Sequence, residues 1–221
     1  MGAKIDWQSV TSQIELGADQ LRVPLSSSAL VKLGDYLQLL YRWNQTYNLT
    51  AVRDPQQMVE QHLLDSLSIA DYLTGERCID VGTGAGLPGM VLAIALPGRQ
   101  WTLLDTNGKK IRFLRQVLIE LGIKDVELAH QRVERFTPAA PFDTVVTRAV
   151  TSVSELWSKC RHLLSCSGCM LAMKGKSPWL ELPEGGLVDA NTSCIQLTVP
   201  GLDAERHLIK IEPQSSSLSK L

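Results

Sequence analysis

A glycine-rich segment, DVGTGAGLPG over residues 80–89, has the clearest chemistry in this sequence. Its glycines at Gly82, Gly84 and Gly86 allow sharp turns and let the backbone approach a ligand with no Cβ in between. Asp105 ends the next apolar run, where a carboxylate can accept hydrogen bonds from both hydroxyls of a ribose. This spacing predicts a site for a ligand that contains an adenosine.

Two kinds of ligand fit this loop. The run from Gly84 to Gly89 matches the GxGxxG pattern of dinucleotide-binding proteins, although one match of that pattern is weak evidence. Asp80 favours S-adenosylmethionine instead, because its carboxylate would repel a pyrophosphate, whereas the zwitterionic methionine half needs polar partners. A structural alternative is an ordinary turn in which Asp80 caps the next helix. We prefer S-adenosylmethionine, with contacts from Asp80, Gly82, Gly84 and Asp105.

Two later segments complete the predicted site. In QRVERF, residues 131–136, Val133 can pack on an adenine ring while Glu134 or a neighbouring backbone group meets its polar edge. The alternative is helix-start chemistry with Glu134 near a helix N-terminus, and the residues alone leave both open. Arg148 follows the next apolar run, where a methyl group would be delivered. An arginine in such a place is more often a structural ion-pair partner, and that alternative also stays open.

A parallel sheet would bring these segments together. From residue 77 onwards, short apolar runs alternate with helical patterns, which indicates a parallel sheet covered on both faces. Such a sheet binds its ligand beyond the carboxyl ends of its strands. The last two strands have no convincing helix between them, which predicts a terminal hairpin. The predicted strands span residues 78–81, 101–104, 126–129, 144–147, 170–173, 195–199 and 208–211, and the helices span 88–95, 109–121 and 153–164.

The residues before the sheet carry only helical signals. Leucines at positions 30, 33, 37 and 40 step by three and four, after serines that can cap a helix. A second helix is predicted from Asp54 and Pro55 to residue 72, with Gly75 ending it. The predicted divisions are a helical extension over 1–75 packed on the next part, a Rossmann-like domain over 76–213, and a flexible tail over 214–221.

The composition fits one large domain with an appendage. The chain has 221 residues, of which 44% are hydrophobic and 20% charged, as is typical of a globular protein with a real core. Its start does not read as a secretory signal, and no apolar run reaches the roughly 18 residues that span a bilayer. Five cysteines in a chain of this size favour a reducing compartment. We expect a cytoplasmic protein with no membrane segment.

Cys166 and Cys169 form a CxxC pair near Cys160 and His162, a grouping that suggests zinc. A structural zinc site normally joins two such clusters, and the sequence has no second CxxC. We interpret the intervening Ser-Gly pair as a turn between a helix and the fifth strand, and we predict no metal site.

The formal net charge of −1 conceals an uneven distribution. Residues 177–205 carry −5 with no Lys or Arg, which leaves +4 for the rest of the chain. Residues 107–117 contain four basic residues and no acid, at the spacing of a helix. Such a run is most often a solvated helix face, but it also suits contact with phosphates of a nucleic acid. The net charge therefore does not exclude an RNA partner.

Together these segments resemble one family, the bacterial 16S ribosomal RNA guanine-N7 methyltransferases, also called glucose-inhibited division protein B. The glycine loop alone would indicate only a class I S-adenosylmethionine-dependent methyltransferase, whereas the two segments before it are far more specific. The matching segments are RWNQTYNLTAVRD (42–54), HLLDSL (62–67), DVGTGAGLPG (80–89), LLDTNGKKIRFLRQV (103–117), QRVERF (131–136), FDTVVTRA (142–149) and AMKG (172–175), with a weaker echo at ERHLI (205–209).

The resemblance implies transfer of a methyl group to N7 of one guanine in the 530 loop of 16S ribosomal RNA. It also implies a class I methyltransferase fold with a mostly parallel, seven-stranded sheet. Guanine N7 has an in-plane lone pair and no proton, so the enzyme needs alignment rather than a general base. We expect Arg148 to position the cofactor and the base, as the catalytic candidate. The cofactor contacts that the resemblance implies are Gly82, Leu87, Val133, Glu134 and Arg148, and Asp105 rests on the ribose argument alone.

Several residues are candidates for contact with the RNA. An Arg or Lys donor to guanine O6 would select the base, and Arg148 and Lys174 both follow strand ends. Asn48, His62 and Asp65 are candidates for an RNA-facing wall, although a histidine such as His62 is more often an interior residue. We expect 16S ribosomal RNA or the small ribosomal subunit as the partner, and a monomer.

Two other functions remain open at this point. An NAD-dependent oxidoreductase would also use a glycine loop, but no substrate domain follows the first half of the sheet, and Asp80 counts against a pyrophosphate. A non-catalytic module that holds S-adenosylmethionine and RNA is the third hypothesis. An intact site argues against it.

Overall fold

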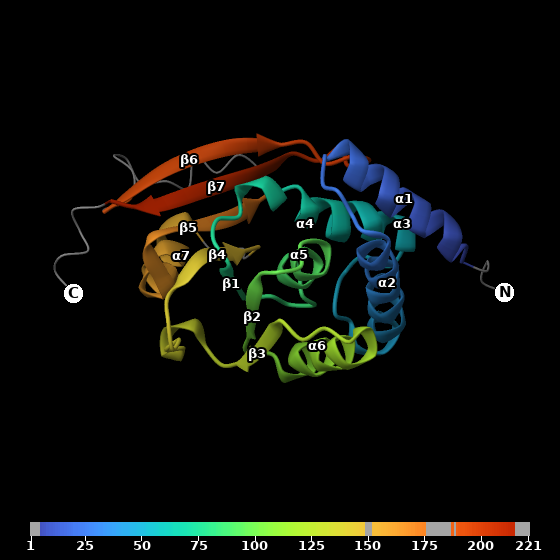
Figure 1. Ribbon diagram of the computed structural model, residues 1–221, viewed down its shortest axis with the longest axis horizontal. Helices are drawn as coiled ribbons and strands as arrows, with labels where there is room; N and C mark the ends of the chain where they lie inside the picture. The colour runs from blue at the N-terminus through green and yellow to red at the C-terminus, as the bar shows by residue number, and fades with distance from the viewer. Residues whose placement is uncertain (1–4, 149–151, 176–186, 188, 215–221) are drawn as a thin grey trace.

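A seven-stranded sheet organises the computed structural model, which describes residues 5–148, 152–175, 187 and 189–214 (Figure 1). The strands lie in the order β3-β2-β1-β4-β5-β7-β6. The first five in this order are parallel to one another, whereas β7 is antiparallel to both β5 and β6. The predicted α/β class with a mostly parallel sheet and a terminal hairpin is confirmed. The strands are β1 (Arg77–Val81), β2 (Gln100–Asp105), β3 (Val126–His130), β4 (Phe142–Thr147), β5 (Leu164–Lys174), β6 (Ala190–Leu197) and β7 (Arg206–Pro213).

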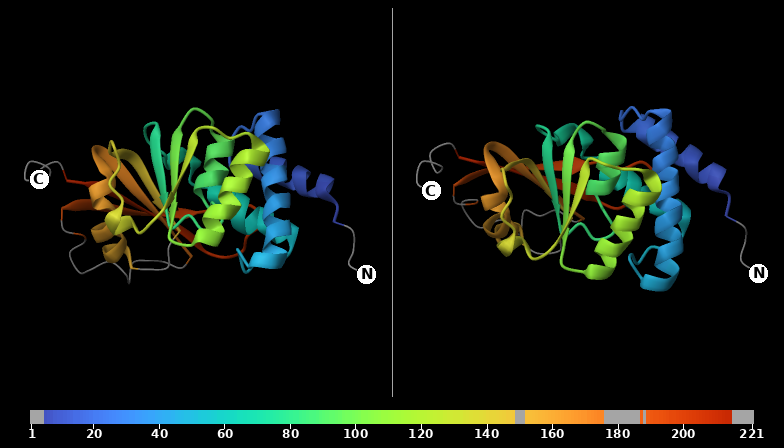
Figure 2. Two further views of the ribbon diagram at one scale, coloured as in Figure 1. Left: turned by 90° about the horizontal axis from the view of Figure 1, so that it is seen from below. Right: turned by 60° about the horizontal axis from the view of Figure 1, so that its bottom comes forward.

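Helices cover both faces of the sheet. On one face, α5 (Gly89–Ala95) and α6 (Gly108–Leu121) contact β2, and α2 (Ser27–Tyr47) packs on the outer side of both helices (Figure 2). On the other face, α7 (Val153–Cys160) contacts β5. The buried apolar side chains accordingly form two clusters, and the larger one joins the N-terminal helices to the sheet.

The N-terminal helices begin where the sequence places its capping residues. The Ser26 hydroxyl accepts the backbone N–H of Ala29 at 3.1 Å, and the Asp54 carboxylate accepts that of Gln57 at 3.0 Å. These caps stabilise the helix N-termini, because the first N–H groups of a helix have no acceptor within the helix. The N-terminal segments are α1 (Trp7–Gln20), α2, α3 (Pro55–Met58), a π-helical segment (Val59–Leu64), α4 (Asp65–Leu67) and a 3-10 turn (Ala70–Tyr72).

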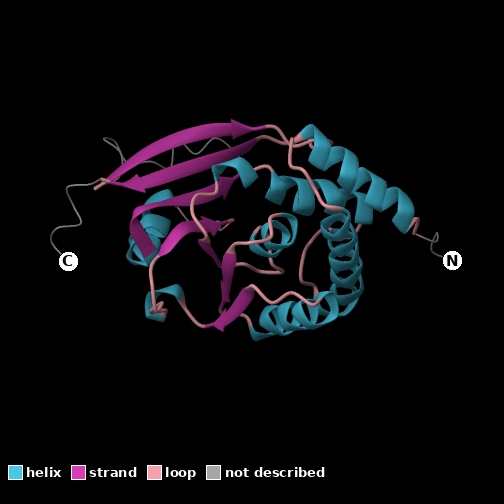
Figure 3. Ribbon diagram, viewed as in Figure 1, coloured by secondary structure: helices cyan, strands magenta, loops and turns pink. Residues whose placement is uncertain are grey.

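The hairpin of β6 and β7 spans the edge of the sheet and extends towards the N-terminal helices (Figure 3). Gly201 lies in its turn, beside the Glu60 side chain of the π-helical segment. The first residue of β7, Arg206, thereby comes close to the same part of the molecule. Elements from opposite ends of the sequence thus meet at the carboxyl edge of the sheet.

The predicted start of the fifth strand is wrong. Instead of a helix to residue 164 followed by a Ser-Gly turn, α7 ends at Cys160, a short 3-10 turn follows, and β5 begins at Leu164. The pairing with β4 advances from Leu164 to Cys169 while β4 advances only from Phe142 to Thr144. The Ser-Gly pair therefore lies in a bulge within the strand. Gly168 is required there because a Cβ would lie 2.9 Å from two carbonyl oxygens of β4.

The predicted range of the sixth strand is also shifted. Residues 195–199 were expected, whereas β6 begins at Ala190, ends at Leu197 and leaves Val199 in the following turn. Several residues of β6 are only half-buried, so its sequence alternates and lacks the continuous apolar run of a central strand. Edge strands of this kind are difficult to delimit from apolar runs alone.

The glycine loop gives a test of this packing. Gly86 has φ +98°, and a Cβ there would lie 2.7 Å from the Cβ of Met90 and 2.8 Å from Cδ2 of Leu114. Gly122 has φ +61° and no atom within 4 Å of such a Cβ. We expect Gly122→Ala to lower the free energy of unfolding by about 1 kcal/mol through backbone strain. Gly86→Ala should lower the free energy of unfolding by about 1–3 kcal/mol more than Gly122→Ala does, because its Cβ overpacks the core. Urea denaturation measures both, and equal losses would contradict the close approach.

Candidate active site

A pocket of about 330 Å³ lies at the carboxyl ends of β1, β2 and β4. It brings together four of the predicted cofactor residues, Gly82, Asp105, Val133 and Glu134. Another hollow, of about 310 Å³, lies at the amino ends of the strands around Arg77, away from the glycine loop. The residues that line the first pocket are Val81, Gly82, Leu104, Asp105, Thr106, Gln131, Arg132, Val133, Glu134, Thr147, Leu156, Lys159 and Cys160.

The glycine loop forms one wall of this pocket. The backbone N–H groups of Gly82 and Thr83 both donate to the carbonyl of Leu104, at 2.9 and 3.0 Å, which fastens the loop to the end of β2. Gly82 has φ +72°, and a Cβ there would meet no protein atom within 4 Å. The space over Gly82 is therefore open for a ligand.

Asp80 is fully buried and holds the glycine loop by hydrogen bonds. Its Oδ2 accepts hydrogen bonds from the Thr83 hydroxyl at 2.6 Å and from the Gly89 N–H at 2.8 Å. Because Gly89 begins α5, this oxygen caps the next helix, as the structural alternative expected. Its Oδ1 has no hydrogen-bond partner among the residues that the structure describes. Burial raises the pKa of Asp80 to about 6, against the opposing effect of these hydrogen bonds. The carboxylate thus has one oxygen that a further donor would satisfy.

Asp105 connects the glycine loop to the start of α6. Its Oδ2 accepts the N–H of Gly84 at 2.8 Å, and its Oδ1 accepts the N–H of Asn107 at 2.7 Å. Each carboxylate oxygen retains a second lone pair, so these bonds leave capacity for two ribose hydroxyls. Gly84 does not line the pocket, but its bond to Asp105 holds it next to a residue that does. Leu87 is 4% exposed and packs in the larger core cluster.

Val133 and Glu134 belong to a single 3-10 turn, Val133–Arg135, at the rim of the pocket. A hydrogen bond from its own backbone N–H and the Lys159 ammonium, 3.7 Å away, lower the pKa of Glu134. Both side chains of this ion pair are well exposed, so it contributes little to stability. The turn does not continue into an α-helix, and the 3-10 geometry therefore differs from the helix start that the sequence also allowed.

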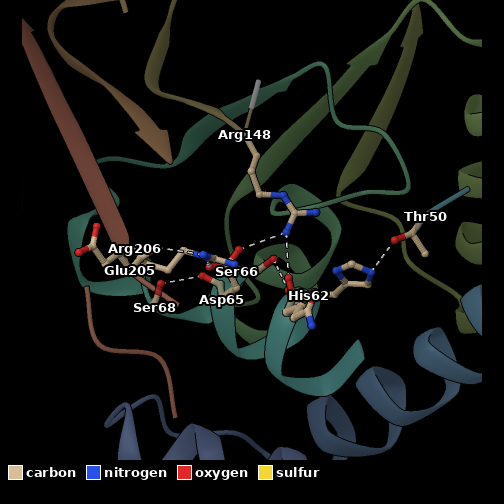
Figure 4. A network of polar contacts seen from close by, with 9 residues as sticks. Thr50, His62, Asp65, Ser66, Ser68, Arg148, Glu205 and Arg206 are labelled. Carbon is tan, nitrogen blue, oxygen red and sulfur yellow. Dashed lines mark hydrogen bonds and ion pairs between the residues drawn. The ribbon is translucent and has the colours of Figure 1, made fainter. Parts of the chain in front are cut away.

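A polar network lies around Arg148, which follows β4 (Figure 4). Its Nη1 donates to the carbonyl of Gln61 at 3.1 Å and to Oδ2 of Asp65 at 3.2 Å. Arg206 donates through Nε to the other oxygen of Asp65 at 2.9 Å. The ion-pair alternative for Arg148 is thus observed. Sequence reasoning did not select Arg206, although the ERHLI segment that contains it was a signal.

His62 is buried, which is the interior alternative that the sequence allowed. Its Nε2 lies 2.8 Å from the Thr50 hydroxyl, as Figure 4 shows. Burial and, to a smaller extent, the positive charge of Arg148 lower the pKa of His62 to about 4. Asp65, another candidate for the RNA-facing wall, is buried as well, and its carboxylate faces two arginines.

The two remaining substrate candidates, Asn48 and Lys174, lie at the ends of different elements. Asn48 is exposed at the end of α2 with φ +51°, and its side-chain oxygen accepts a hydrogen bond from Arg53. Lys174 is buried at the end of β5, in register with His207. Sequence reasoning also missed Asn44, which is buried and holds the loop beneath His62 by accepting the N–H of Thr50 at 2.9 Å.

The described residues hold no group of three or more His, Cys, Asp or Glu side chains that could bind a metal ion. In the same residues, none of the helices is both long and apolar enough to cross a membrane. Of the CxxC pair, Cys166 is exposed and Cys169 is buried in β5.

Proteins of known family resemble this chain over most of its length. A family model described as rRNA small subunit methyltransferase G (GidB) matches residues 29–209. The "Ribosomal RNA small subunit methyltransferase G" of Hydrogenovibrio crunogenus is 47% identical over 201 residues, which cover 91% of this chain and 93% of that protein. The protein of the same name from Pseudomonas aeruginosa is 47% identical over 206 residues, covering 91% and 95%.

Solved structures share the fold at much lower identity. The ribosomal protein L11 methylase from Lactobacillus delbrueckii subsp. bulgaricus superimposes with a TM-score of 0.54 and 16% identity, covering 73% of this chain and 80% of that one. TrmN from Thermus thermophilus gives a TM-score of 0.53 and 18% identity, covering 77% and 53%. These likenesses show the fold alone.

The buried His62 predicts a pH-dependent contribution to stability. Its pKa is about 4 in the folded chain and about 6.5 when unfolded, so between these values the unfolded chain binds more protons. Folding stability therefore falls as pH drops from about 6.5 to 4. Over that pH range we expect the free energy of unfolding of the wild type to fall by up to about 3 kcal/mol more than that of His62→Gln.

The difference between the two unfolding free energies is the quantity to measure, by urea denaturation at several pH values. Asp80, whose pKa is raised to about 6, changes stability in the opposite direction, but it is present in both proteins and cancels. A difference that stays constant from pH 7 to about 4 would show that His62 is not buried in its neutral form.

Proposed function

The chain belongs to the rRNA small subunit methyltransferase G (GidB) family, and from that premise we propose that it transfers a methyl group from S-adenosylmethionine to N7 of a guanine in the 530 loop of 16S ribosomal RNA. The chain is a methyltransferase by family and by fold. The observation that supports the proposal best is the pocket at the strand ends, where Gly82, Asp105, Val133 and Glu134 converge. Action on ribosomal RNA in turn implies a cytoplasmic enzyme.

The pocket residues fit S-adenosylmethionine by their chemistry. Asp105 has acceptor capacity for the ribose hydroxyls, and Val133 offers an apolar surface for the adenine. Asp80 is buried behind the glycine loop, and its Oδ1, which has no partner among the described residues, suits a cationic donor such as an α-ammonium group. When bound, S-adenosylmethionine supplies an electrophilic methyl group on a positively charged sulfur.

The reaction asks the chain to align groups rather than to move a proton. The bond from guanine N7 to the methyl carbon forms as the bond from sulfur to that carbon breaks, and N7 carries no proton to remove. A general base is therefore not needed, and His62, whose pKa is lowered to about 4, would be a weak one. Alignment and exclusion of water are the means of rate enhancement that remain.

Arg148 is the residue that we assign to this alignment. It leaves the end of β4 next to the pocket residue Thr147, and its charge lowers the pKa of both Asp80 and His62, so it lies between the glycine loop and the N-terminal helices. A guanidinium donor to guanine O6 would orient the base, whereas a donor to N7 would block the reaction. Lys174, at the end of β5, is the second candidate for such a contact.

The two alternative functions, an oxidoreductase and a non-catalytic binding module, can each be distinguished from a methyltransferase. Family membership argues against an NAD-dependent oxidoreductase. A non-catalytic module that holds S-adenosylmethionine and RNA differs from an enzyme only in turnover, which is measured directly.

Transfer of a labelled methyl group is the test of this function. We expect purified protein, incubated with methyl-labelled S-adenosylmethionine and small ribosomal subunits or their RNA from cells that lack the gene, to label one guanine at N7. Mapping of the labelled nucleotide by nuclease digestion and mass spectrometry identifies base and atom. Subunits from cells that have the gene serve as a control, because their site is already methylated. Cofactor binding without label in any guanine N7 would refute the proposed reaction.

The open space over Gly82 gives a test of the cofactor site. We expect Gly82→Ala to weaken S-adenosylmethionine binding at least about tenfold, because its Cβ would enter the pocket. Gly122→Ala is the matched control, since Gly122 also has a positive φ and open space but lies at the far end of α6. Equilibrium dialysis gives both dissociation constants. Equal affinities in the two variants would place the cofactor elsewhere.

A further inference from the structure

Three segments that lie far apart in the sequence meet at one carboxylate, that of Asp65 in α4 (Figure 4). Its Oδ2 accepts a hydrogen bond from Arg148, 83 residues away, and its Oδ1 accepts one from Arg206, 141 residues away. One arginine follows the last residue of β4, and the other begins β7. The carboxylate thus joins the N-terminal helices, the centre of the sheet and the terminal hairpin.

The burial of this group makes the arrangement specific. The side chain of Asp65 is 3% exposed, whereas those of Arg148 and Arg206 are 28% and 21% exposed. A buried carboxylate needs a partner for each oxygen, because it has lost its hydration, and here each oxygen has its own guanidinium. Buried ion pairs of this kind add little net stability, but they define geometry.

The contacts of Arg148 define its orientation. Both of its hydrogen bonds, to Asp65 and to the carbonyl of Gln61, come from Nη1. Its Nε and Nη2 donate to none of the residues that the structure describes, and the side chain is partly exposed. Because a guanidinium group is planar, fixing Nη1 also fixes the directions of the remaining donors.

We propose that Asp65 is a positioning residue for methyl transfer: it holds Arg148 so that the unused donors of this guanidinium meet O6 of the target guanine. Arg206 occupies the second oxygen of Asp65 and prevents the carboxylate from turning. The inference rests on the proposed function, because it assigns a purpose to Arg148 in that reaction. It also gives the HLLDSL segment a role behind the site instead of contact with RNA.

The charge of Asp65 acts in the same direction. During transfer, positive charge moves from the sulfur atom to the guanine ring as N7 gains the methyl group. A second positive charge on an unpaired Arg148 would oppose that movement. The carboxylate at 3.2 Å, which Arg148 shares with Arg206, offsets part of this charge, so Arg148 can donate a hydrogen bond to O6 with less repulsion of the product cation.

Asp65→Asn is the central variant, and Ser68→Ala is its matched control. Ser68 lies on the same helical segment and donates to the backbone carbonyl of Asp65 at 2.6 Å, so its loss disturbs this residue without touching the carboxylate. We expect Asp65→Asn to lower kcat about 10- to 100-fold while the Kd for S-adenosylmethionine changes less than about threefold. Ser68→Ala should leave kcat within about twofold. Rates are expressed per cofactor-binding site, so that an unfolded fraction does not count.

A double-mutant cycle with Arg148→Ala shows whether Asp65 acts through that arginine. We expect Asp65→Asn to cost less than about threefold in kcat when Arg148 is already alanine, because the positioned group is then absent. An equal loss in both backgrounds would overturn the proposal, as would a kcat of Asp65→Asn equal to that of wild type. A purely structural role would instead lower cofactor binding in parallel with the rate.

Arg206→Gln provides a second route if Asp65→Asn does not fold. It retains the bond from Asp65 to Arg148 and removes the other tether, so kcat should fall less than about tenfold and the loss should again vanish in the Arg148→Ala background. An undiminished loss in that background would also overturn the proposal. Failure of wild type to label guanine N7 would refute the proposed function itself, which is a different result.

Discussion

The site depends on two carboxylates that stand at the ends of neighbouring strands and fasten one glycine loop. Asp80 accepts bonds from Thr83 and Gly89, and Asp105 accepts one from Gly84. Burial of Asp80 opposes its ionisation, as its raised pKa shows, and the hydrogen bonds from the loop offset that effect. Because these bonds fix the loop, Gly82 stays in its left-handed conformation, and the pocket above it stays open.

The N-terminal helices belong to this arrangement and are more than a cover for the sheet. The buried hydroxyl of Tyr36 in α2 donates to the carbonyl of Ala85 at 2.8 Å, so the loop is held from above as well as from the strand ends. The next helical segment carries Asp65 and the Gln61 carbonyl to Arg148. Apolar side chains of these helices and of the sheet share one core cluster. Loosening them would therefore disturb both the pocket and the arginine beside it.

The sequence was informative where function depends on local spacing. An apolar run overlaps each strand that the structure describes, although the bounds predicted for β5 and β6 were wrong. The glycines and Asp105 pointed to the pocket, because a strand, a turn and the next strand end are fixed by short-range geometry. The bulge in β5 was missed, since the closeness of Gly168 to carbonyls of β4 is a tertiary contact. The same holds for the pairing of Asp65 with Arg206 across 141 residues, which no spacing rule reveals.

Recognition of RNA by a chain with a formal charge of −1 is then a matter of where its charges lie. At Asp65 two arginines share one carboxylate, which leaves a single positive charge beside the site. On α6, Lys109, Arg112 and Arg115 are exposed, and the helix starts next to Asp105 through the bond from Asn107. Phosphate contacts supply affinity, and base contacts select the nucleotide. An enzyme that must leave after one transfer is served by a few local charges, and a strongly basic surface would slow its release.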